Sequence, residues 1–231
     1  MFGSIIQSND IVGASLAIAT IATISCAVLI FLGLTWSNER WRLPVALAGS
    51  ALLAAALQYV DASHVWLATQ KMTSAHRYSA WFVVSPLQVA SVYFMANAVG
   101  FVPSGVFWRT VVAAFLMVLC RYLGEAGVFN PTLGILLSIA FWLYILGEMY
   151  FGRMSDVIQA ADRPVRIGYF WIRLIMTIGW AIYPILSFVD VVIGVGHVAP
   201  VITLYTIADL VNLVALSLTV LAIAGREQYR P

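Results

Sequence analysis

The sequence has little charge, a single lysine and few residues of the types that bind metals. Charged side chains make up 10% of the 231 residues, and the one lysine is Lys71. Cys26 and Cys120 both lie inside apolar stretches, which argues against a disulfide framework. A net charge of +2, with the basic residues scattered, gives no indication of a nucleic-acid partner. The three histidines lie outside the centres of the apolar stretches, so we expect neither an enzyme nor a metal site.

Apolar residues instead dominate the chain, in stretches long enough to cross a membrane. They make up 62% of the sequence, and the mean hydropathy is +0.95. A membrane-spanning helix needs roughly 20 apolar residues. Seven stretches qualify, at about 11–36, 44–67, 77–101, 104–124, 128–151, 168–190 and 199–224. The connections are short apart from a charged one at 152–167, so we expect one all-α, seven-helix domain over residues 1–231, embedded in the lipid bilayer of the cell membrane.

The positions of the arginines predict how the bundle is oriented. One set of connections and ends contains Arg40, Arg42, Arg109, Arg153, Arg163, Arg166, Arg226 and Arg230. The opposite set contains Lys71 and, at a helix end, Arg77. Because basic residues accumulate on the cytoplasmic side, we expect the N-terminus outside the cell and the C-terminus in the cytoplasm.

Asp209, near the middle of the seventh stretch, marks a site. A carboxylate at this depth is costly unless it is paired, and such residues are usually functional. We predict a buried pair between Asp209 and Arg77, with Tyr183 as an additional hydrogen-bond donor. Arg121 and Glu125 are four residues apart on one helix face, and we expect them to form a local ion pair near the outer surface.

Aromatic residues around a proline indicate a cavity in the bundle. Trp180 and Tyr183 are three residues apart and share a helix face, and Pro184 bends the helix toward a cavity or a neighbour. Together with Trp81 and Trp142 they would line a slot in the centre of the bundle. Ordinary aromatic packing, or a belt at the membrane interface, is the alternative interpretation.

Several motifs, in order and with matching spacing, resemble those of the microbial rhodopsins and especially the proteorhodopsin branch. The third stretch reads Arg77-Tyr-x-x-Trp81, with Pro86 five residues later. The later stretches contain Gly124-Glu-Ala-Gly127, Gly179-Trp-Ala-Ile-Tyr-Pro184 and Ala208-Asp-Leu-Val-Asn212. The first two stretches are similar to that family in length and hydropathy alone.

The resemblance implies a pocket for the polyene retinal. In it, Gly124 would leave room for the ring of the polyene, Gln88 would occupy a position that tunes colour, and Asp209 would match the second counterion. Arg77 would match the arginine beneath the Schiff base. The complete pocket expected on this basis consists of Trp81, Gln88, Gly124, Trp142, Trp180, Tyr183, Pro184, Tyr205, Asp209 and Leu213.

The same resemblance identifies four positions at which this chain departs from the family pattern. The lysine that carries retinal corresponds to Leu213, four residues after Asp209. Only an amine can condense with the aldehyde of retinal, so we expect no covalent pigment. The proton acceptor corresponds to Ala80, the proton donor to Ser91, and a histidine that accompanies the acceptor to Gln58. Conventional light-driven proton pumping is therefore not expected.

Three functions remain open after these departures. The aromatic slot favours a protein that binds retinal or a related isoprenoid without a covalent bond. The second is a ligand-free seven-helix interaction subunit, either as the pentamer or hexamer common in the family or in association with a conventional rhodopsin. The third is a light-independent transporter or channel, whose candidate polar path consists of Gln88, Ser91, Asp209 and Arg77.

Overall fold

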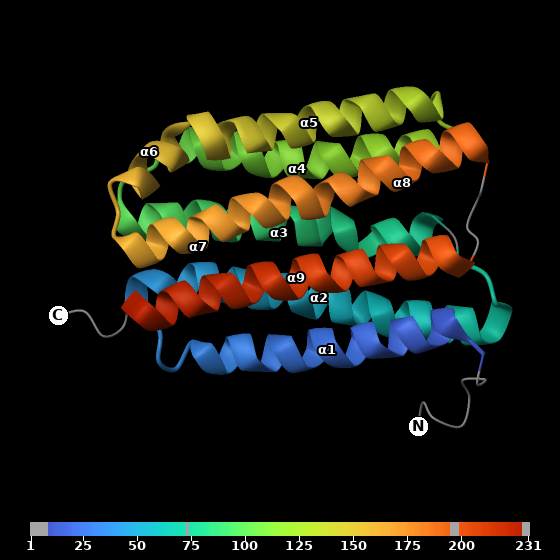
Figure 1. Ribbon diagram of the computed structural model, residues 1–231, viewed down its shortest axis with the longest axis horizontal. Helices are drawn as coiled ribbons and strands as arrows, with labels where there is room; N and C mark the ends of the chain where they lie inside the picture. The colour runs from blue at the N-terminus through green and yellow to red at the C-terminus, as the bar shows by residue number, and fades with distance from the viewer. Residues whose placement is uncertain (1–8, 73, 195–198, 228–231) are drawn as a thin grey trace.

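The chain folds into a bundle of membrane-spanning helices (Figure 1). The computed structural model describes residues 9–72, 74–194 and 199–227, without the side chains of 74–77, 190, 192 and 193. All regular structure in these residues is helical, and seven of the helical rods they form are long and apolar enough to cross a membrane. The elements are α1 (Ile11–Gly33), α2 (Glu39–Thr69), α3 (Ser74–Val99), α4 (Ser104–Glu125), α5 (Pro131–Phe151), α6 (Arg153–Gln159), α7 (Arg163–Leu174), the π-helical turn η1 (Ile175–Gly179), α8 (Trp180–Ile193) and α9 (Ala199–Glu227).

The seven expected stretches are all present, but the long polar connection is not. Residues 152–167 were expected to link the fifth and sixth helices, whereas α6 prolongs the fifth rod to Gln159 and α7 begins at Arg163. The prediction was wrong because the charged residues of this segment lie on the outer faces of helices. Val165, for example, is fully buried while Arg166 next to it is exposed.

The rods are arranged as consecutive antiparallel neighbours, with the last rod returning to the first. In Figure 1, α1, α2 and α9 pack together on one side of the bundle, α4 and α5 on the other, and α3 lies between α2 and α4. Small residues allow these close contacts, as is typical of helices in lipid. The buried face of α2 includes Ala48, Gly49, Ala51, Ala55 and Ala56.

The contact between α4 and α5 depends on two glycines. A Cβ on Gly134 would lie 2.8 Å from the carbonyl oxygen of Cys120 and 2.9 Å from the Cα of Gly124. Both neighbours are backbone atoms, which cannot move aside as a flexible side chain can. Gly124 and Gly134 therefore let the two backbones approach each other closely.

We predict that Gly134→Ala destabilises the protein by about 1–3 kcal/mol, the usual cost of overpacking. Gly147→Ala is the matched control, because Gly147 lies on the same helix and a Cβ there would meet open space. It should be neutral or slightly stabilising, since alanine favours helix over glycine. Thermal unfolding of both variants in detergent checks this, and equal midpoints would contradict the packing role of Gly134.

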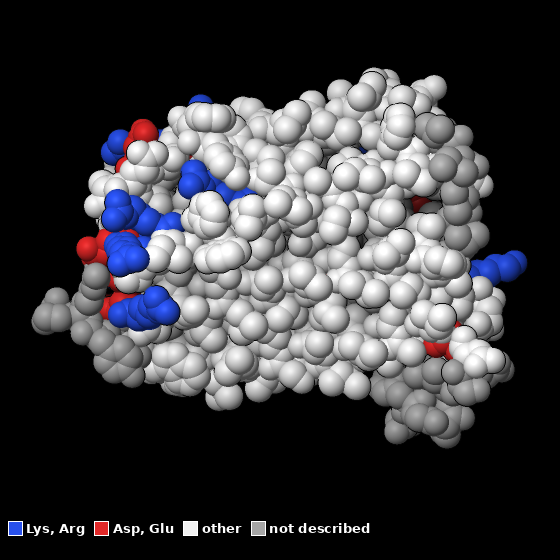
Figure 2. All heavy atoms as spheres, viewed as in Figure 1, with Lys and Arg blue, Asp and Glu red and all other residues white. Residues whose placement is uncertain are grey.

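On the face shown in Figure 2, most of the charged side chains lie toward the two ends of the bundle. Figure 2 shows a white middle on the visible face, with most of the blue spheres at the end where α6, α7 and the last turn of α9 lie. That end includes Arg40, which lies 3.7 Å from Glu227, and the exposed Arg163 and Arg166. The orientation predicted from the sequence, with this end in the cytoplasm, stays a prediction.

Candidate functional site

A cavity in the interior of the bundle is the candidate site. Its volume is about 90 Å³, taken as the space open to the centres of water-sized spheres. One water needs about 10–15 Å³ by this measure, so the cavity has room for a larger guest. Its lining comes from α3, α4, α5, α8 and α9 and is mostly apolar: Tyr78, Trp81, Met117, Val118, Arg121, Ile135, Ser138, Ile139, Trp142, Trp180, Tyr183, Pro184, Ser187, Tyr205 and Asp209.

Seven of the ten residues expected in the pocket line this cavity. They are Trp81, Trp142, Trp180, Tyr183, Pro184, Tyr205 and Asp209. Their rings pack against one another: Trp81 meets Tyr183 edge-on at 5.4 Å between ring centroids, and Tyr183 stacks on Tyr205 at 6.2 Å. Trp180 and Tyr183 of the sixth rod therefore form part of a cavity wall.

The π-helical turn η1 positions Trp180 at the cavity. A π-helical turn leaves carbonyl groups without their usual helical partners, and such turns are frequent at functional sites. Here Trp142 Nε1 donates to the carbonyl of Met176 at 2.9 Å, and Asn212 Nδ2 donates to the carbonyl of Gly179 at 3.0 Å. A Cβ on Gly179 would collide with the Asn212 side chain, so this glycine lets α9 approach the turn.

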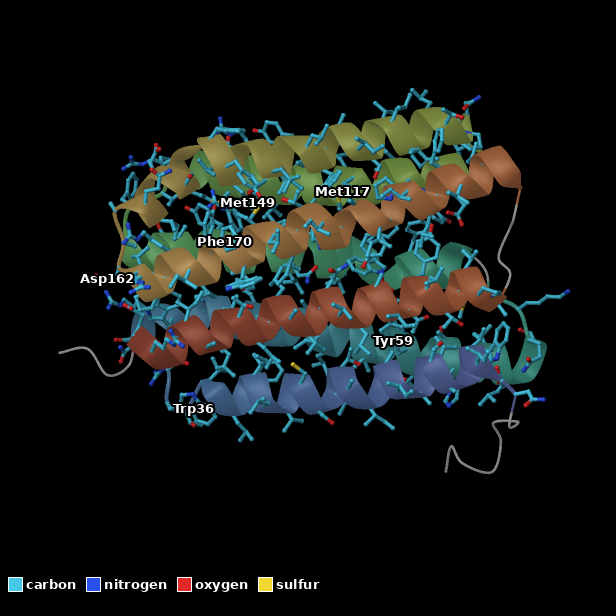
Figure 3. All side chains as sticks on the ribbon, in the orientation of Figure 1. Trp36, Tyr59, Met117, Met149, Asp162 and Phe170 are labelled. Atoms are coloured by element: carbon cyan, nitrogen blue, oxygen red, sulfur yellow. The ribbon has the colours of Figure 1, made fainter. Side chains whose placement is uncertain are left out.

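Asp209 is buried beside the cavity and is held by a residue that the sequence analysis did not identify. Asp209 is only 6% exposed, and the Tyr59 hydroxyl of α2 donates a hydrogen bond to Asp209 Oδ2 at 2.9 Å. Figure 3 marks Tyr59 where α2 and α9 pass each other. The side chain of Arg77, the predicted partner of Asp209, lies outside the described residues. Tyr183, the predicted additional donor, accepts a hydrogen bond from Asn212 Nδ2 at 3.2 Å.

Three expected pocket residues do not line the cavity. Gly124 lies at the α4–α5 contact and makes room there for Gly134, so the expected space for a ring is not at this residue. Gln88 is fully buried, and its amide atoms have no hydrogen-bond partner among the described residues. Leu213 is 1% exposed and lies in the core, one turn of α9 after Asp209.

The remaining replaced positions lie inside the bundle. Ala80 is buried, Gln58 is half-buried, and the Ser91 hydroxyl donates to the Pro44 carbonyl at 2.8 Å. Ser91 thus joins α3 to α2, which is a structural role. Lys71 is exposed in the short connection between α2 and α3. As the single lysine of the chain, it leaves every membrane-spanning helix without a side-chain amine.

The cavity contains a charged residue that sequence reasoning did not assign to it. Arg121 was expected in an ion pair near the outer surface, and it does lie 3.3 Å from Glu125. The pair is nearly buried, however, with side chains 10% and 11% exposed, and Arg121 lines the cavity. Arg121 Nε also donates to Ser187 Oγ at 2.9 Å. The sequence did contain a signal for this role, because Arg121 lies inside an apolar stretch where a charged residue is rare.

The remaining lining residues that the sequence analysis missed are mostly apolar or small. Met117, Val118, Ile135, Ser138 and Ile139 come from α4 and α5, and Figure 3 marks Met117 on α4. Tyr78 of α3 and Ser187 of α8 complete the lining. Such residues carry no distinctive motif, because any apolar residue on these helices could face either the cavity or the lipid.

Comparisons with known proteins agree with this architecture. The chain is 26% identical over 226 residues to a green-light absorbing proteorhodopsin from Gamma-proteobacterium EBAC31A08, covering 97% of this chain and 91% of that protein. It is 26% identical over 227 residues to a blue-light absorbing proteorhodopsin from Gamma-proteobacterium Hot 75m4, covering 97% and 90%.

Solved structures show the same fold. The crystal structure of blue light-absorbing proteorhodopsin from Med12 matches with a TM-score of 0.79 at 26% identity, covering 94% of this chain and 98% of that one. Exiguobacterium sibiricum rhodopsin matches with a TM-score of 0.83 at 19% identity, covering 94% and 97%. Residues 11–226 match the family described as bacteriorhodopsin-like protein, and the chain is therefore a multi-pass membrane protein of the microbial rhodopsin family.

Proposed function

We propose that this protein binds retinal or a related isoprenoid in the central cavity without a covalent bond, and that it is not a conventional light-driven proton pump. One observation carries the proposal: an aromatic cavity lies in a bundle whose spanning helices contain no lysine. Apolar burial contributes about 25 cal/mol per Å² before the costs of association, so an elongated apolar ligand can be held by burial alone.

The positions that replace the pump residues support the second part of the proposal. Ala80 and Ser91 cannot act as a carboxylate acceptor and donor, and Ser91 is engaged in a bond between helices. Ser91 and Gln88 also belong to the polar path that a transporter would need. The direction of the Ser91 hydroxyl, toward the Pro44 carbonyl, favours ligand binding over conduction.

The proposal predicts saturable binding of one all-trans retinal per chain to the purified protein. Quenching of tryptophan fluorescence measures it, because Trp81, Trp142 and Trp180 line the cavity. Lys71→Arg removes the last lysine and should bind retinal equally well. Ser138→Phe fills the cavity and should weaken binding by about tenfold or more, since a tenfold loss needs only about 1.4 kcal/mol. Leu136→Phe, on the lipid-facing side of the same helix at 59% exposure, is its control.

Solvent extraction of the protein from its native membrane, followed by mass analysis, identifies the natural ligand. An apolar isoprenoid at one per chain is the expected result. An empty extract from a protein that also refuses retinal would contradict the proposal. It would favour the alternative function, a ligand-free subunit that associates with copies of itself or with a conventional rhodopsin.

A further inference from the structure

Arg173 is a charged residue of the sixth spanning rod that the central cavity does not use. It lies ten residues after Arg163, where that rod begins, which is about 15 Å along the helix axis. Figure 3 marks Asp162 at the end of the bundle and Phe170, three residues before Arg173, further inward. An arginine at such a position in a membrane-spanning helix is costly unless its charge is paired.

No carboxylate of the described residues forms an ion pair with Arg173. Glu148, the one carboxylate of α5, is bound by Arg109 at 2.8 Å. Arg173 Nε is buried and has no hydrogen-bond partner in the described part of the chain. The terminal nitrogens Nη1 and Nη2 make no hydrogen bond to these residues either and, unlike Nε, are not fully buried. The outer edge of the guanidinium is therefore accessible to a ligand.

Two tyrosine rings hold the guanidinium of Arg173 in place. Its Cζ lies 4.7 Å from the centre of the Tyr150 ring and 5.3 Å from the centre of the Tyr169 ring. Such cation–π contacts are favourable, but a neutral ring does not cancel the charge of the arginine. The Tyr169 hydroxyl donates to the Met149 carbonyl at 3.0 Å, and the Tyr150 hydroxyl lies 3.0 Å from Thr177 Oγ1. Both rings are thus anchored, and they position the cation without neutralising it.

The exposed surface of α7 beside Arg173 is apolar, with one further arginine. Phe170 and Trp171 are 51% and 52% exposed, so both rings face the surrounding lipid. Arg166 is exposed and lies seven residues before Arg173, about two turns away on the same helix face. Figure 2 shows blue spheres set back from the end of the bundle, between the positions of α5 and α7. A ligand that matches this surface combines an apolar chain with an anionic group.

The charge of the surrounding segment favours a ligand with a net negative charge. Residues 153–173 contain four arginines and two aspartates, which gives a net charge of +2. A zwitterionic headgroup would bring a positive group together with its phosphate, whereas an anionic headgroup brings the phosphate charge alone. Arginine binds phosphate strongly because its planar guanidinium can donate two parallel hydrogen bonds.

We propose that Arg173 and Arg166 bind the phosphate group of an anionic phospholipid, with an acyl chain of that lipid lying along Phe170 and Trp171. The lipid belongs to the leaflet at the arginine-rich end of the bundle, and basic sites between spanning helices are suited to such headgroups. A soluble anion matches the two arginines but not the apolar surface beside them. The site lies outside the central cavity, so this inference does not depend on the proposed function.

The test counts the lipids that stay bound to the purified full-length protein in native mass spectrometry. With equal amounts of phosphatidylglycerol and phosphatidylcholine supplied, we expect one phosphatidylglycerol per chain, bound in preference. Arg173→Met should weaken this binding by about tenfold or more, the order of effect expected for a lost hydrogen bond to a charged group. Arg173→Lys keeps the charge but loses the planar guanidinium, so its affinity should lie between the two.

Arg226→Met is the matched control, because it removes one positive charge from an exposed arginine at the same end of the bundle. It should retain the bound phosphatidylglycerol. A ligand that binds the folded state raises the unfolding temperature. Added phosphatidylglycerol should therefore stabilise the unsubstituted protein and Arg226→Met in detergent, and it should have little effect on Arg173→Met.

Equal retention of phosphatidylglycerol by the unsubstituted protein and Arg173→Met would overturn the inference, as would equal binding of the two lipids. Glycerol phosphate, which is soluble and carries the same phosphate group, should not displace the lipid. Displacement would show a site for free anions and would exclude a lipid as the specific occupant. If Arg173→Met does not fold, Arg173→Lys is compared with Arg226→Met, and equal lipid retention by these two variants contradicts the role of Arg173.

Discussion

Leu213→Lys, supplied with all-trans retinal, is expected to give a coloured pigment at one retinal per chain. Leu213 is buried and lies one turn of α9 after Asp209, which lines the cavity, so the two residues share a helix face. A lysine side chain is longer than leucine and places its amine toward the same space. Condensation with the aldehyde forms a Schiff base, and Asp209 is the carboxylate left to stabilise its protonated form, because Ala80 supplies none.

Absorption spectroscopy follows the new visible band, and mass analysis after borohydride reduction locates the adduct at residue 213. Val211→Lys is the control, because that position is 58% exposed on the same helix and its amine faces away from the cavity. A folded but colourless Leu213→Lys protein would show that position 213 does not reach a retinal-sized space.

The pigment of Leu213→Lys is not expected to pump protons. Ala80 and Ser91 still replace the acceptor and the donor, so the Schiff base has no usual relay on either side. Illuminated vesicles that contain the variant should therefore show no sustained pH change.

Asp209→Ala is expected to lower stability by about 3–5 kcal/mol, the loss typical when one member of a buried charge pair is removed. The change takes the acceptor from the Tyr59 hydroxyl and leaves the cation that balances Asp209, Arg77 in our hypothesis, uncompensated. Thermal unfolding in detergent measures the effect. Asp156→Ala, at an exposed position on α6, should change stability by no more than about 0.5 kcal/mol.

Tyr59→Phe tests the hydrogen bond between Tyr59 and Asp209 separately from the charge of Asp209. Alone it should cost about 1.5–3 kcal/mol, the usual value for a hydrogen bond to a charged group, and it should cost less when Asp209 is already alanine. An unchanged unfolding temperature for Asp209→Ala would show that the buried pair between Asp209 and Arg77 is wrong.

The fold could be predicted from the sequence because lipid imposes a simple length rule. Seven apolar stretches became seven spanning rods, with boundaries shifted by a few residues at most ends. The exception was residues 152–167, where charged residues on helix surfaces looked like a loop. An amphipathic helix such as α7, with Val165 inside and Arg166 outside, has too little apolar sequence to be recognised by hydropathy alone.

Site residues that belong to a local sequence motif could be predicted, whereas residues that reach the site through contacts between distant helices could not. Trp180 and Tyr183 were identified because they lie close to Pro184 on one helix face, and Trp81 because it belongs to a motif that resembles the family. Tyr59 and Ser187 were missed, since nothing in the local sequence of α2 or α8 tells which residue of a distant helix they will meet.

Gly124 shows the opposite difficulty. A resemblance to a family transfers a residue type but not the contact that it makes, and here the glycine serves the approach of two helices.

The η1 turn limits how the sixth rod tolerates the deletion of a residue. An α-helix advances about 100° around its axis per residue, and a π-helical turn accommodates one residue more than an α-helical turn. Upstream of η1, Tyr169 is oriented toward the Met149 carbonyl; downstream, Trp180 is oriented toward the cavity. Deleting a single residue within 175–179 would restore regular α-helical winding and rotate Trp180 and the residues after it by about 100° around the helix axis. The two halves of this rod therefore keep their separate orientations only while the extra residue is retained.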